Sequence, residues 1–363
     1  MIKWLSLVAI VGACGTEDPS AISGSRVPEA GSNQGTISSD ARVRDDVPVT
    51  ADVMIPPGAD ATIGRRDAMP SSLTIEALQV AGTHNSYHVA PAVAFDASHN
   101  YTQLPLDQQL AGGVRALELD LHLGVNGVFE IYHISFIDPN TTCSTLDDCL
   151  HVIATWSDAH SSHTPIFVWF ELKDDTGGQR ITDLIPVETA ILKVFRPEQL
   201  ITAAWLRGSH ASPHERIVTA GWPTLAEARG RIMFSIITRD ARTQAYSHDF
   251  TSLDDRIMFV NAAPEQFSLP WASITKVDVS QVDVAADALA AHLLVATNVC
   301  AINLSDAECQ SRSTSAVGAG IHMLHDDLPF PISGRTYSLK LPGGSPGCNP
   351  VTAPPNCAPS LLE

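Results

Sequence analysis

An alternating pattern of acidic and apolar residues in the segment 116–122 is the first sign of a chemical site. Glu118 and Asp120 alternate there with leucine residues. Because successive side chains of a β-strand point to opposite faces, the two carboxylates share one face and the leucines share the other. Carboxylates held this close repel each other unless a proton or a cation lies between them. The segment therefore predicts a strand with a cation site on one face and core packing on the other.

Two further oxygen-bearing side chains occur where neighbouring apolar segments end. Asn85 lies in the polar cluster that follows an apolar run, and Glu171 lies near the end of the segment 165–173, which is rich in β-branched and aromatic residues. Together with Glu118 and Asp120, they offer a set of oxygen ligands suited to a hard cation such as Ca²⁺. The set contains no cysteine, which favours calcium or magnesium over zinc. The sequence therefore predicts a calcium site formed by these four residues.

Two histidines and a lysine lie close to the predicted ligands in the sequence. His84 precedes Asn85, His133 follows a short apolar segment, and Lys173 lies two residues after the last predicted ligand. Many substitution reactions need a base for the nucleophile, an acid for the leaving group and positive charge near the reacting group. Histidine can fill the acid and base roles because its pKa lies near neutrality. We therefore expect His84 and His133 to be catalytic and Lys173 to bind substrate, whereas His122 is expected to be structural.

As a set, these pieces resemble the X region of phosphatidylinositol-specific phospholipase C. They occur along the chain in the order His84-Asn85, Glu118-x-Asp120, His133 and Glu171. The segments 82–87 and 143–157 are most similar to the calcium-dependent bacterial branch of that family. Metal-free bacterial relatives carry an arginine where this chain has Asp120. The resemblance runs from Leu78 to Asp240 and, more weakly, to Pro329.

The resemblance implies both a fold and a reaction. The fold would be a TIM-type (β/α)8 barrel. The reaction would cleave phosphatidylinositol into diacylglycerol and a cyclic or acyclic inositol phosphate, with the inositol 2-hydroxyl as nucleophile. By the same resemblance, His84 would act near the nucleophile and the phosphate, and His133 would be the general acid for the diacylglycerol oxygen. The expected cofactor is Ca²⁺, and the expected partner is a phospholipid substrate at a membrane surface.

Two other functions are compatible with the same residues. Glycerophosphodiesterase-like enzymes share the barrel and the Glu-x-Asp…His pattern, but they usually begin with His-Arg-Gly where this chain has His84-Asn85-Ser86. The second alternative is a non-catalytic, calcium-binding surface lipoprotein that retains the fold. Loss of either candidate histidine would have supported it, and both are present.

Strand and helix patterns alternate along the chain, as in an α/β protein with a mainly parallel sheet. The predicted strands are 114–123, 129–133, 165–173, 231–238, 256–262 and 320–324, and the predicted helices are 105–113, 145–156, 187–195, 222–230 and 282–294. The region 71–330 has the usual length of a (β/α)8 barrel. A doubly wound open sheet is the structural alternative, but no glycine-rich phosphate loop follows the first strand. Asp326 and Asp327 follow the last predicted strand, where they either cap a helix or support the site.

The first 70 residues are expected to export and tether the protein. Residues 1–14 resemble a bacterial lipoprotein signal, with an apolar run too short to span a bilayer and a lipobox-like Val11-Gly12-Ala13-Cys14. The segment 15–70 has no aromatic residue and no further cysteine, which predicts a flexible linker. We expect lipidation at Cys14 and attachment to the cell envelope, at the outer membrane in a Gram-negative source. A plain secretory signal and a secreted protein are the alternative.

Net charge limits the kinds of partner that the protein can bind, and the number of cysteines indicates the compartment in which it folds. The net charge of −18 argues against nucleic acid as a partner, because phosphate backbones require a basic surface. We expect a monomer. Seven cysteines include Cys14, and the even remainder in an exported protein predicts disulfide bonds. Many connectivities are open, of which nearest neighbours favour Cys143–Cys149, Cys300–Cys309 and, in a Pro/Gly-rich C-terminal tail at 331–363, Cys348–Cys357. The sequence contains no Cys-x-x-Cys pair, so a cysteine-bound zinc site is not expected.

The anchor can be tested directly. Cys14→Ser removes the sulfur that would be acylated, so the variant is expected to move from the membrane fraction to the soluble fraction. Mass spectrometry of the wild-type N-terminus should show an acyl chain. A variant that stays with the membrane, together with an unacylated wild type, would contradict the lipoprotein prediction.

Overall fold

The computed structural model describes residues 73–174 and 178–363. The predicted signal at 1–14 and the predicted linker at 15–70 lie outside the described residues. Within the described part of the chain, no helix is both long and apolar enough to cross a membrane.

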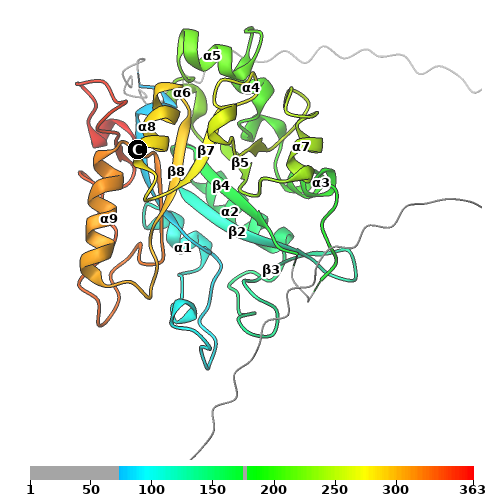
Figure 1. Cartoon of the computed structure of the whole chain (residues 1–363), viewed down its shortest axis with the longest axis vertical. Coiled ribbons are helices and arrows are strands. Elements are labelled where there is room, and N and C mark those ends of the chain that lie inside the picture. Colours follow the sequence, from blue (N-terminus) through cyan, green and yellow to red (C-terminus); the bar gives the residue numbers. More distant parts are fainter. Residues whose placement is uncertain (1–72, 175–177) are drawn as a thin grey trace, which may run out of the picture. The chain divides into compact units, whose positions relative to one another are not determined.

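Eight parallel strands form the centre of the fold, in the order β6-β5-β4-β2-β1-β9-β8-β7 (Figure 1). Their bounds are β1 Leu78–Thr83, β2 Ala116–Leu123, β4 Ile166–Leu172, β5 Ile232–Ile236, β6 Phe259–Val260, β7 Ile274–Asp278, β8 Leu294–Cys300 and β9 Met323–Asp326. The strands curl into a nearly closed barrel, which confirms the predicted TIM-type (β/α)8 architecture.

The remaining seam of the barrel, between β6 and β7, is joined largely by side chains. The Ala262 N–H donates to the Ile274 carbonyl at 3.0 Å. Asn261 Oδ1 accepts from the Lys276 N–H at 2.8 Å, and the Arg239 guanidinium donates to Asn261 Oδ1 at 2.7 Å and to the Lys276 carbonyl at 3.1 Å. These bonds fix Lys276 in place, which matters for the site described below.

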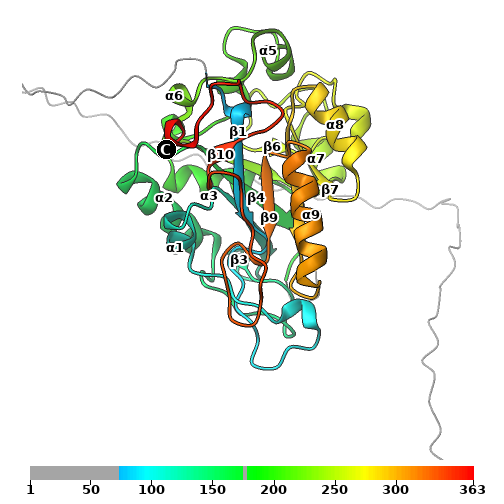
Figure 2. The same cartoon turned by 90° about the vertical axis from the view of Figure 1, so that its left-hand side faces the viewer.

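Helices surround the strands, and α9 lies alongside β8 and β9 (Figure 2). The α-helices are α1 Leu106–Ala111, α2 Leu146–Ala159, α3 Ile185–Val194, α4 Ala203–Arg207, α5 Pro213–Ala220, α6 Leu225–Ala228, α7 Ala241–Tyr246, α8 Val282–Ala290 and α9 Asp306–Gly318. The short 3₁₀ helices are η1 Ile75–Ala77, η2 Ala97–His99, η3 Pro197–Gln199, η4 Pro264–Gln266 and η5 Pro359–Leu361. Helix α2 begins with a capping box, in which the Thr145 side chain accepts from the Asp148 N–H.

The sequence patterns failed in the last third of the barrel. The predicted helix 282–294 ends at Ala290, and β8 begins at Leu294; the prediction missed this break because mostly apolar residues continue from one element into the other. Neither β7 nor β8 was predicted. Helix α9 was also missed, because the side chains that it buries are the small Cys309, Ser313 and Ala316, which give no apolar stripe.

Strand bounds also differ from the predictions, and two of the differences affect the description of the site region. The predicted strand 256–262 shortens to β6, Phe259–Val260. The predicted strand 320–324 is shifted to β9, Met323–Asp326, so that Asp326 belongs to the strand and only Asp327 follows it.

A close approach of the backbones brings β1 against its neighbours. Gly82 pairs with Ala116 of β2 and with His325 of β9. A Cβ atom at Gly82 would lie 2.9 Å from the Ala116 Cβ and 3.2 Å from the Leu324 carbonyl oxygen. The position therefore requires glycine, and the strand that it keeps in place leads directly into His84 and Asn85.

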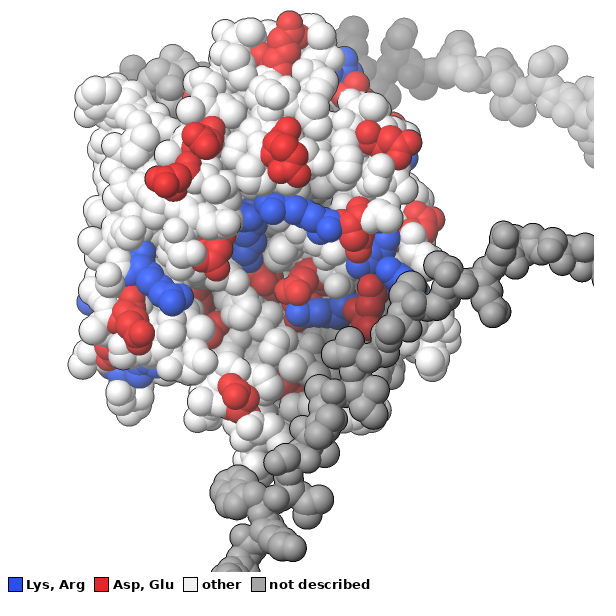
Figure 3. Space-filling view, in the orientation of Figure 1, with Lys and Arg blue, Asp and Glu red and all other residues white. Residues whose placement is uncertain are grey.

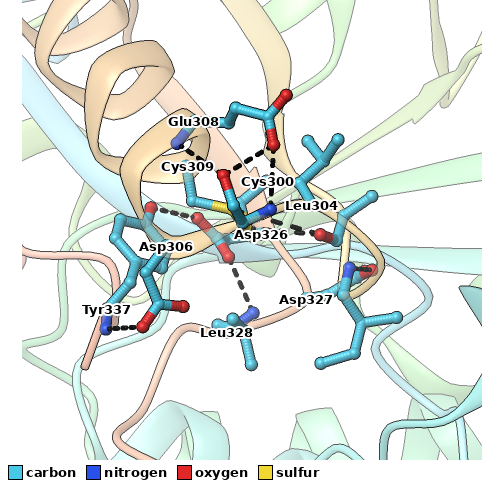
Figure 4. The surroundings of a disulfide bond; sticks show 12 residues. Cys300, Leu304, Asp306, Glu308, Cys309, Asp326, Asp327, Leu328 and Tyr337 are labelled. Carbon is cyan, nitrogen blue, oxygen red and sulfur yellow. Dashed lines mark hydrogen bonds between the residues drawn. A yellow bond between two sulfur atoms is a disulfide. The ribbon is translucent and has the colours of Figure 1, made fainter. Parts of the chain in front are cut away.

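Two short strands and three disulfides complete the fold. Strand β3, Phe129–Ile131, forms an antiparallel hairpin with β2, and β10, Gly347–Cys348, pairs antiparallel with β1. The residues after 331 pack against the barrel, with Leu339, Leu341 and Leu362 buried. The structure contains the disulfides Cys143–Cys149, Cys300–Cys309 and Cys348–Cys357. Of these, Cys300–Cys309 joins the end of β8 to α9 (Figure 4).

Candidate active site

Three acidic side chains meet where β2 and β4 run side by side. Asp120 of β2 is the register partner of Glu171 of β4, and Glu118 lies two residues earlier on the same face of β2. Carboxylate oxygens of the three residues lie within 4.8 Å of one another, and we call this group the acidic cluster. The alternating leucines of β2 are buried in the core, as predicted. Figure 3 shows acidic side chains inside a hollow on this face, with lysine and arginine side chains at its border.

Two lysines neutralise part of the charge of the acidic cluster. Lys276 Nζ lies 2.5 Å from Glu118 Oε2. Lys173 Nζ lies 3.1 Å from Asp120 Oδ2 and 2.9 Å from Glu171 Oε1. Lys173 was predicted to bind substrate, and the structure places it between two predicted metal ligands. Lys276 was missed because its strand, β7, was not predicted; a single lysine inside a short apolar segment was the only available signal.

The carboxylates of the acidic cluster differ in their tendency to ionise. Burial opposes ionisation of Glu118, but Lys276, followed by His84 and His325, lowers its pKa to about 2. Burial raises the pKa of Asp120 to about 7, with help from the charges of Glu171 and Glu118 and against the effect of Lys173. Glu118 is therefore ionised at neutral pH, whereas Asp120 has too little positive charge nearby to be fully ionised there.

The carboxylate oxygens of Asp120 could be satisfied by a divalent cation. Both of its carboxylate oxygens are buried and accept no well-aligned hydrogen bond from the described residues, although Lys173 pairs with one of them. Buried anionic oxygens without donors are costly, and a cation satisfies several at once. The donor set consists of oxygen atoms, which hard cations such as Ca²⁺ prefer. The residues present therefore fit the predicted metal.

Asn85 borders the acidic cluster through a tyrosine. It has a left-handed backbone, with φ of 42°, and is buried. Its Oδ1 accepts from the Tyr87 hydroxyl at 3.4 Å. Burial, followed by the charge of Asp120, raises the pKa of Tyr87 well above its usual range, and the intervening Ser86 N–H donates to the Glu118 carbonyl at 2.9 Å. The structure thus brings Asn85 to the edge of the cluster.

His84 links the acidic cluster to the end of β9, the strand on the other side of β1. Its Nδ1 lies 2.8 Å from Asp327 Oδ1, and its Nε2 lies 3.9 Å from Glu118 Oε1. Asp327 is held in turn by the Ile302 N–H, at 2.8 Å from Oδ2. Burial opposes protonation of His84, but the charges of Asp327 and Glu118 outweigh it and raise the pKa to about 9. The side chain is 28% exposed, so it can reach a bound molecule.

The two aspartates at the end of β9 have different partners. Asp327 contacts His84, whereas Asp326 accepts from the Tyr337 hydroxyl at 2.6 Å and from the Leu328 N–H at 2.7 Å (Figure 4). Asp326 is therefore bound to the loop that follows β9, and Asp327 supports the site. The sequence left both roles open.

His325 lies behind Glu118 and was not predicted to contribute. Its Nδ1 lies 3.1 Å from the Thr83 carbonyl and 3.6 Å from Glu118 Oε2. Burial, together with the charge of Lys276, lowers its pKa to about 3, so the ring is neutral at physiological pH. A neutral ring that donates to a carbonyl fixes the position of β9 against β1.

His133 occupies the neighbouring loop after β3. Its Nδ1 lies 2.9 Å from Asp138 Oδ2, and its side chain is partly exposed. Burial lowers its pKa, and the charges of Lys173 and His84 contribute, so His133 lies within electrostatic reach of both. Asp138 was not predicted. His122 stacks on Tyr132, with ring centroids 3.7 Å apart, and its Nε2 lies 2.8 Å from the Tyr132 carbonyl, as expected of a structural residue.

A match to a family model shows which protein family the chain belongs to. A model described as "Phosphoinositide phospholipase C, Ca2+-dependent" matches residues 125–350. The chain belongs to this family. His84, Glu118 and Asp120 lie before the matched residues, so their assignment rests on the geometry above. No curated protein matches the chain.

Solved structures of the same family share the fold. A calcium-dependent phosphoinositol-specific phospholipase C from the Gram-negative bacterium Pseudomonas sp., in its apo form, is 16% identical, with a TM-score of 0.54 over 77% of this chain and 96% of that chain. A Ca²⁺-dependent phosphatidylinositol-specific phospholipase C from Streptomyces antibioticus is 19% identical, with a TM-score of 0.54 over 70% of this chain and 95% of that chain.

The pairing of His84 with Asp327 predicts a measurable pKa change. Asp327→Asn removes the nearest negative charge but leaves the ring buried, so the pKa of His84 should fall from about 9 by more than one unit, since an adjacent opposite charge shifts a pKa by about 1–3 units. Histidine NMR titration in chelator measures this. Asp255→Asn, which removes the exposed partner of His248, is the matched control.

The pairing of His84 with Asp327 also predicts how the stability of the folded protein depends on pH. The folded pKa of His84 lies above its usual value of 6.5, so its contribution is fully present below that pH and is lost as the pH rises through about 9. Asp327→Asn should therefore destabilise the protein more at pH 6 than at pH 10. An unchanged His84 pKa in the variant would show that Asp327 does not control this group.

Proposed function

We propose that this protein cleaves the phosphodiester of phosphatidylinositol in a calcium-dependent reaction, releasing diacylglycerol and a cyclic or acyclic inositol phosphate. The observation that carries the proposal is the joint position of His84 and the acidic cluster. His84 Nε2 lies 3.9 Å from Glu118 Oε1, at the carboxyl ends of parallel strands in a chain of the phosphoinositide phospholipase C family. Active sites of TIM barrels lie at this end of the strands.

The acidic cluster would hold the metal. Glu118, Asp120 and Glu171 supply carboxylate oxygens, and Asn85 supplies an amide oxygen at the edge of the cluster. Bound calcium supplies positive charge that polarises a phosphate oxygen and lowers the pKa of a nearby hydroxyl. Two of the three carboxylates already pair with Lys173, so the metal has to share or displace that contact.

Each candidate histidine has one ring nitrogen engaged and the other left for proton exchange. Asp327 engages Nδ1 of His84, so Nε2 is the atom that exchanges a proton with the nucleophile or the phosphate. Asp138 engages Nδ1 of His133, so Nε2 carries the proton for the diacylglycerol oxygen. A lowered pKa makes the imidazolium form of His133 the stronger acid, which suits donation to an alkoxide.

Local positive charge would attract the substrate to a chain of net charge −18. Lys173, the predicted substrate-binding residue, and Lys276 lie beside the acidic cluster, at 22% and 8% side-chain exposure. They place ammonium groups where an anionic phosphate would approach. The partner is a phospholipid at a membrane surface. The enzyme would act as a monomer, exported and anchored through Cys14, which lies outside the described residues.

Removal of calcium tests the metal. A calcium chelator should abolish release of diacylglycerol from phosphatidylinositol vesicles, and added calcium should restore it. Asp120→Asn should weaken activity and its calcium dependence together, whereas Asp147→Asn, an exposed change in α2, should alter neither. Full activity in chelator would contradict the proposal. Restoration by magnesium alone, with cleavage of glycerophosphodiesters instead, would favour the glycerophosphodiesterase alternative.

Replacement of the histidines tests the acid–base roles. His84→Ala and His133→Ala should each lower kcat by roughly 10²–10⁴-fold, the usual contribution of a positioned acid or base. Both rings are partly exposed, so the variants should keep the wild-type circular dichroism, although His84→Ala should lose the stability that the pairing with Asp327 contributes. If either variant turns over at the wild-type rate, that histidine is not part of the mechanism. Wild-type protein that binds calcium but cleaves no phosphodiester would support the non-catalytic alternative.

A further inference from the structure

A second group of titratable side chains lies beside the candidate active site. Three histidines surround one fully buried carboxylate, and we call His88, His99, His133 and Asp138 the histidine cluster. His88 Nε2 lies 2.7 Å from Asp138 Oδ2, His133 Nδ1 lies 2.9 Å from the same oxygen, and His99 Nδ1 lies 3.9 Å from it. The ligand atoms of His88, His133 and Asp138 lie within 4.8 Å of one another.

The loops after β1 and β3 build the histidine cluster. His88 pairs with Thr141 across the two loops, and the Thr142 N–H donates to the Tyr87 carbonyl at 2.7 Å. The disulfide Cys143–Cys149 then ties the second loop to α2. The cluster is therefore held by backbone pairing and by a covalent link, as expected of a built site.

The orientation of His88 is that of a metal ligand. Its Nδ1 lies 3.0 Å from the Tyr101 carbonyl, which can only accept, so Nδ1 carries the hydrogen. This leaves the Nε2 lone pair directed at a carboxylate oxygen, and a second proton or a metal ion has to lie between the two atoms. Histidines that bind metals commonly donate their other N–H to a backbone carbonyl in this way, which fixes the tautomer.

Two buried polar atoms of the histidine cluster lack a hydrogen bond. Asp138 Oδ1 and His99 Nδ1 have no hydrogen-bond partner among the described residues. The side chain of Asp138 is inaccessible to solvent, and His99 is 8% exposed. Unpaired groups at this depth are costly, so a ligand that engages them stabilises the site.

We propose that the histidine cluster binds a divalent transition-metal ion of the zinc class. Three imidazole nitrogens and one carboxylate make a four-ligand set, which suits tetrahedral zinc; calcium prefers oxygen ligands. Tetrahedral ligand atoms at zinc distances lie roughly 3.3 Å apart. The contacts at 2.7 and 2.9 Å need to open only slightly, while His99 closes from 3.9 Å. The ligands come from two separate loops, so no single sequence motif contains them.

Zinc at this position would switch off the proposed reaction. A metal ion on His133 Nδ1 keeps that ring from becoming a doubly protonated imidazolium, so it can no longer cycle as a general acid. Zinc is therefore an inhibitor that competes with a proton and not with calcium. The inhibition rests on the proposed function of His133, whereas the binding does not.

Binding can be tested on the full-length protein after metal removal with a chelator and desalting. Zinc binding is followed by isothermal titration calorimetry, and cobalt(II) serves as the spectroscopic probe of tetrahedral nitrogen ligation. Wild type should bind zinc at one saturable site and give tetrahedral cobalt bands. His88→Gln and His99→Gln should each weaken zinc binding by more than ~10-fold, since even outer-shell changes cost about 10–100-fold.

Three matched variants locate the site. His151→Gln, at an exposed histidine of α2, should bind zinc as wild type does. Asp120→Asn should also leave zinc binding unchanged, because it alters only the acidic cluster. His99 lies on a short surface 3₁₀ helix, so His99→Gln tests the site even if the buried His88→Gln fails to fold. No zinc binding by wild type, equal affinity in His99→Gln, or loss of affinity in Asp120→Asn would overturn the proposal.

An activity measurement separates this inference from the proposed function. Zinc should inhibit phosphatidylinositol cleavage at the concentrations that fill the site, and excess calcium should not relieve it. Binding without any lipid cleavage by wild type would remove the proposed function and leave the metal site standing. Cleavage that persists at saturating zinc would overturn the inhibitory role.

Discussion

Repulsion among three carboxylates in one small space is the constraint around which this site is organised. The parallel register of β2 and β4 places Asp120 opposite Glu171, and the two-residue repeat of a strand puts Glu118 on the same face. Burying such a group is unfavourable unless positive charge accompanies it. Lys276 pairs with Glu118, and Lys173 pairs with Asp120 and Glu171, yet neither Asp120 oxygen accepts a well-aligned hydrogen bond within the described part of the chain. A bound cation at the proposed site would satisfy it.

Other strands and loops of the barrel position the side chains that surround the acidic cluster. Gly82 allows β1 to lie close to β2 and β9, so that His84 reaches Glu118 on one side and Asp327 on the other. The seam between β6 and β7 fixes Lys276 through Asn261. The loops after β1 and β3, paired with each other, hold His133 against Asp138. A catalytic geometry of this kind depends on rigid strands more than on any single contact.

The sequence predicted the acidic cluster because the two-residue repeat of a strand puts Glu118 and Asp120 on one face. The barrel was predicted from the alternation of strands and helices together with the family resemblance. It could not predict Lys276, because the sequence pattern did not reveal the five-residue strand β7. Asp138 and His325 were also missed, since each is defined by a partner distant in sequence or by a loop conformation. Asp327 was noticed, but its role depends on the pairing of β9 with β1, which local patterns do not contain.

Direct titration of calcium tests the central claim, that the acidic cluster is a cation site. Isothermal calorimetry on metal-free wild type should show one saturable calcium site. Glu171→Gln removes one charge at the rim, where the side chain is 36% exposed, and should weaken that affinity without changing the melting temperature of the metal-free protein. Glu215→Gln, far from the cluster in α5, should bind calcium as wild type does. Absence of calcium binding by wild type, or equal affinity in Glu171→Gln, would contradict the account.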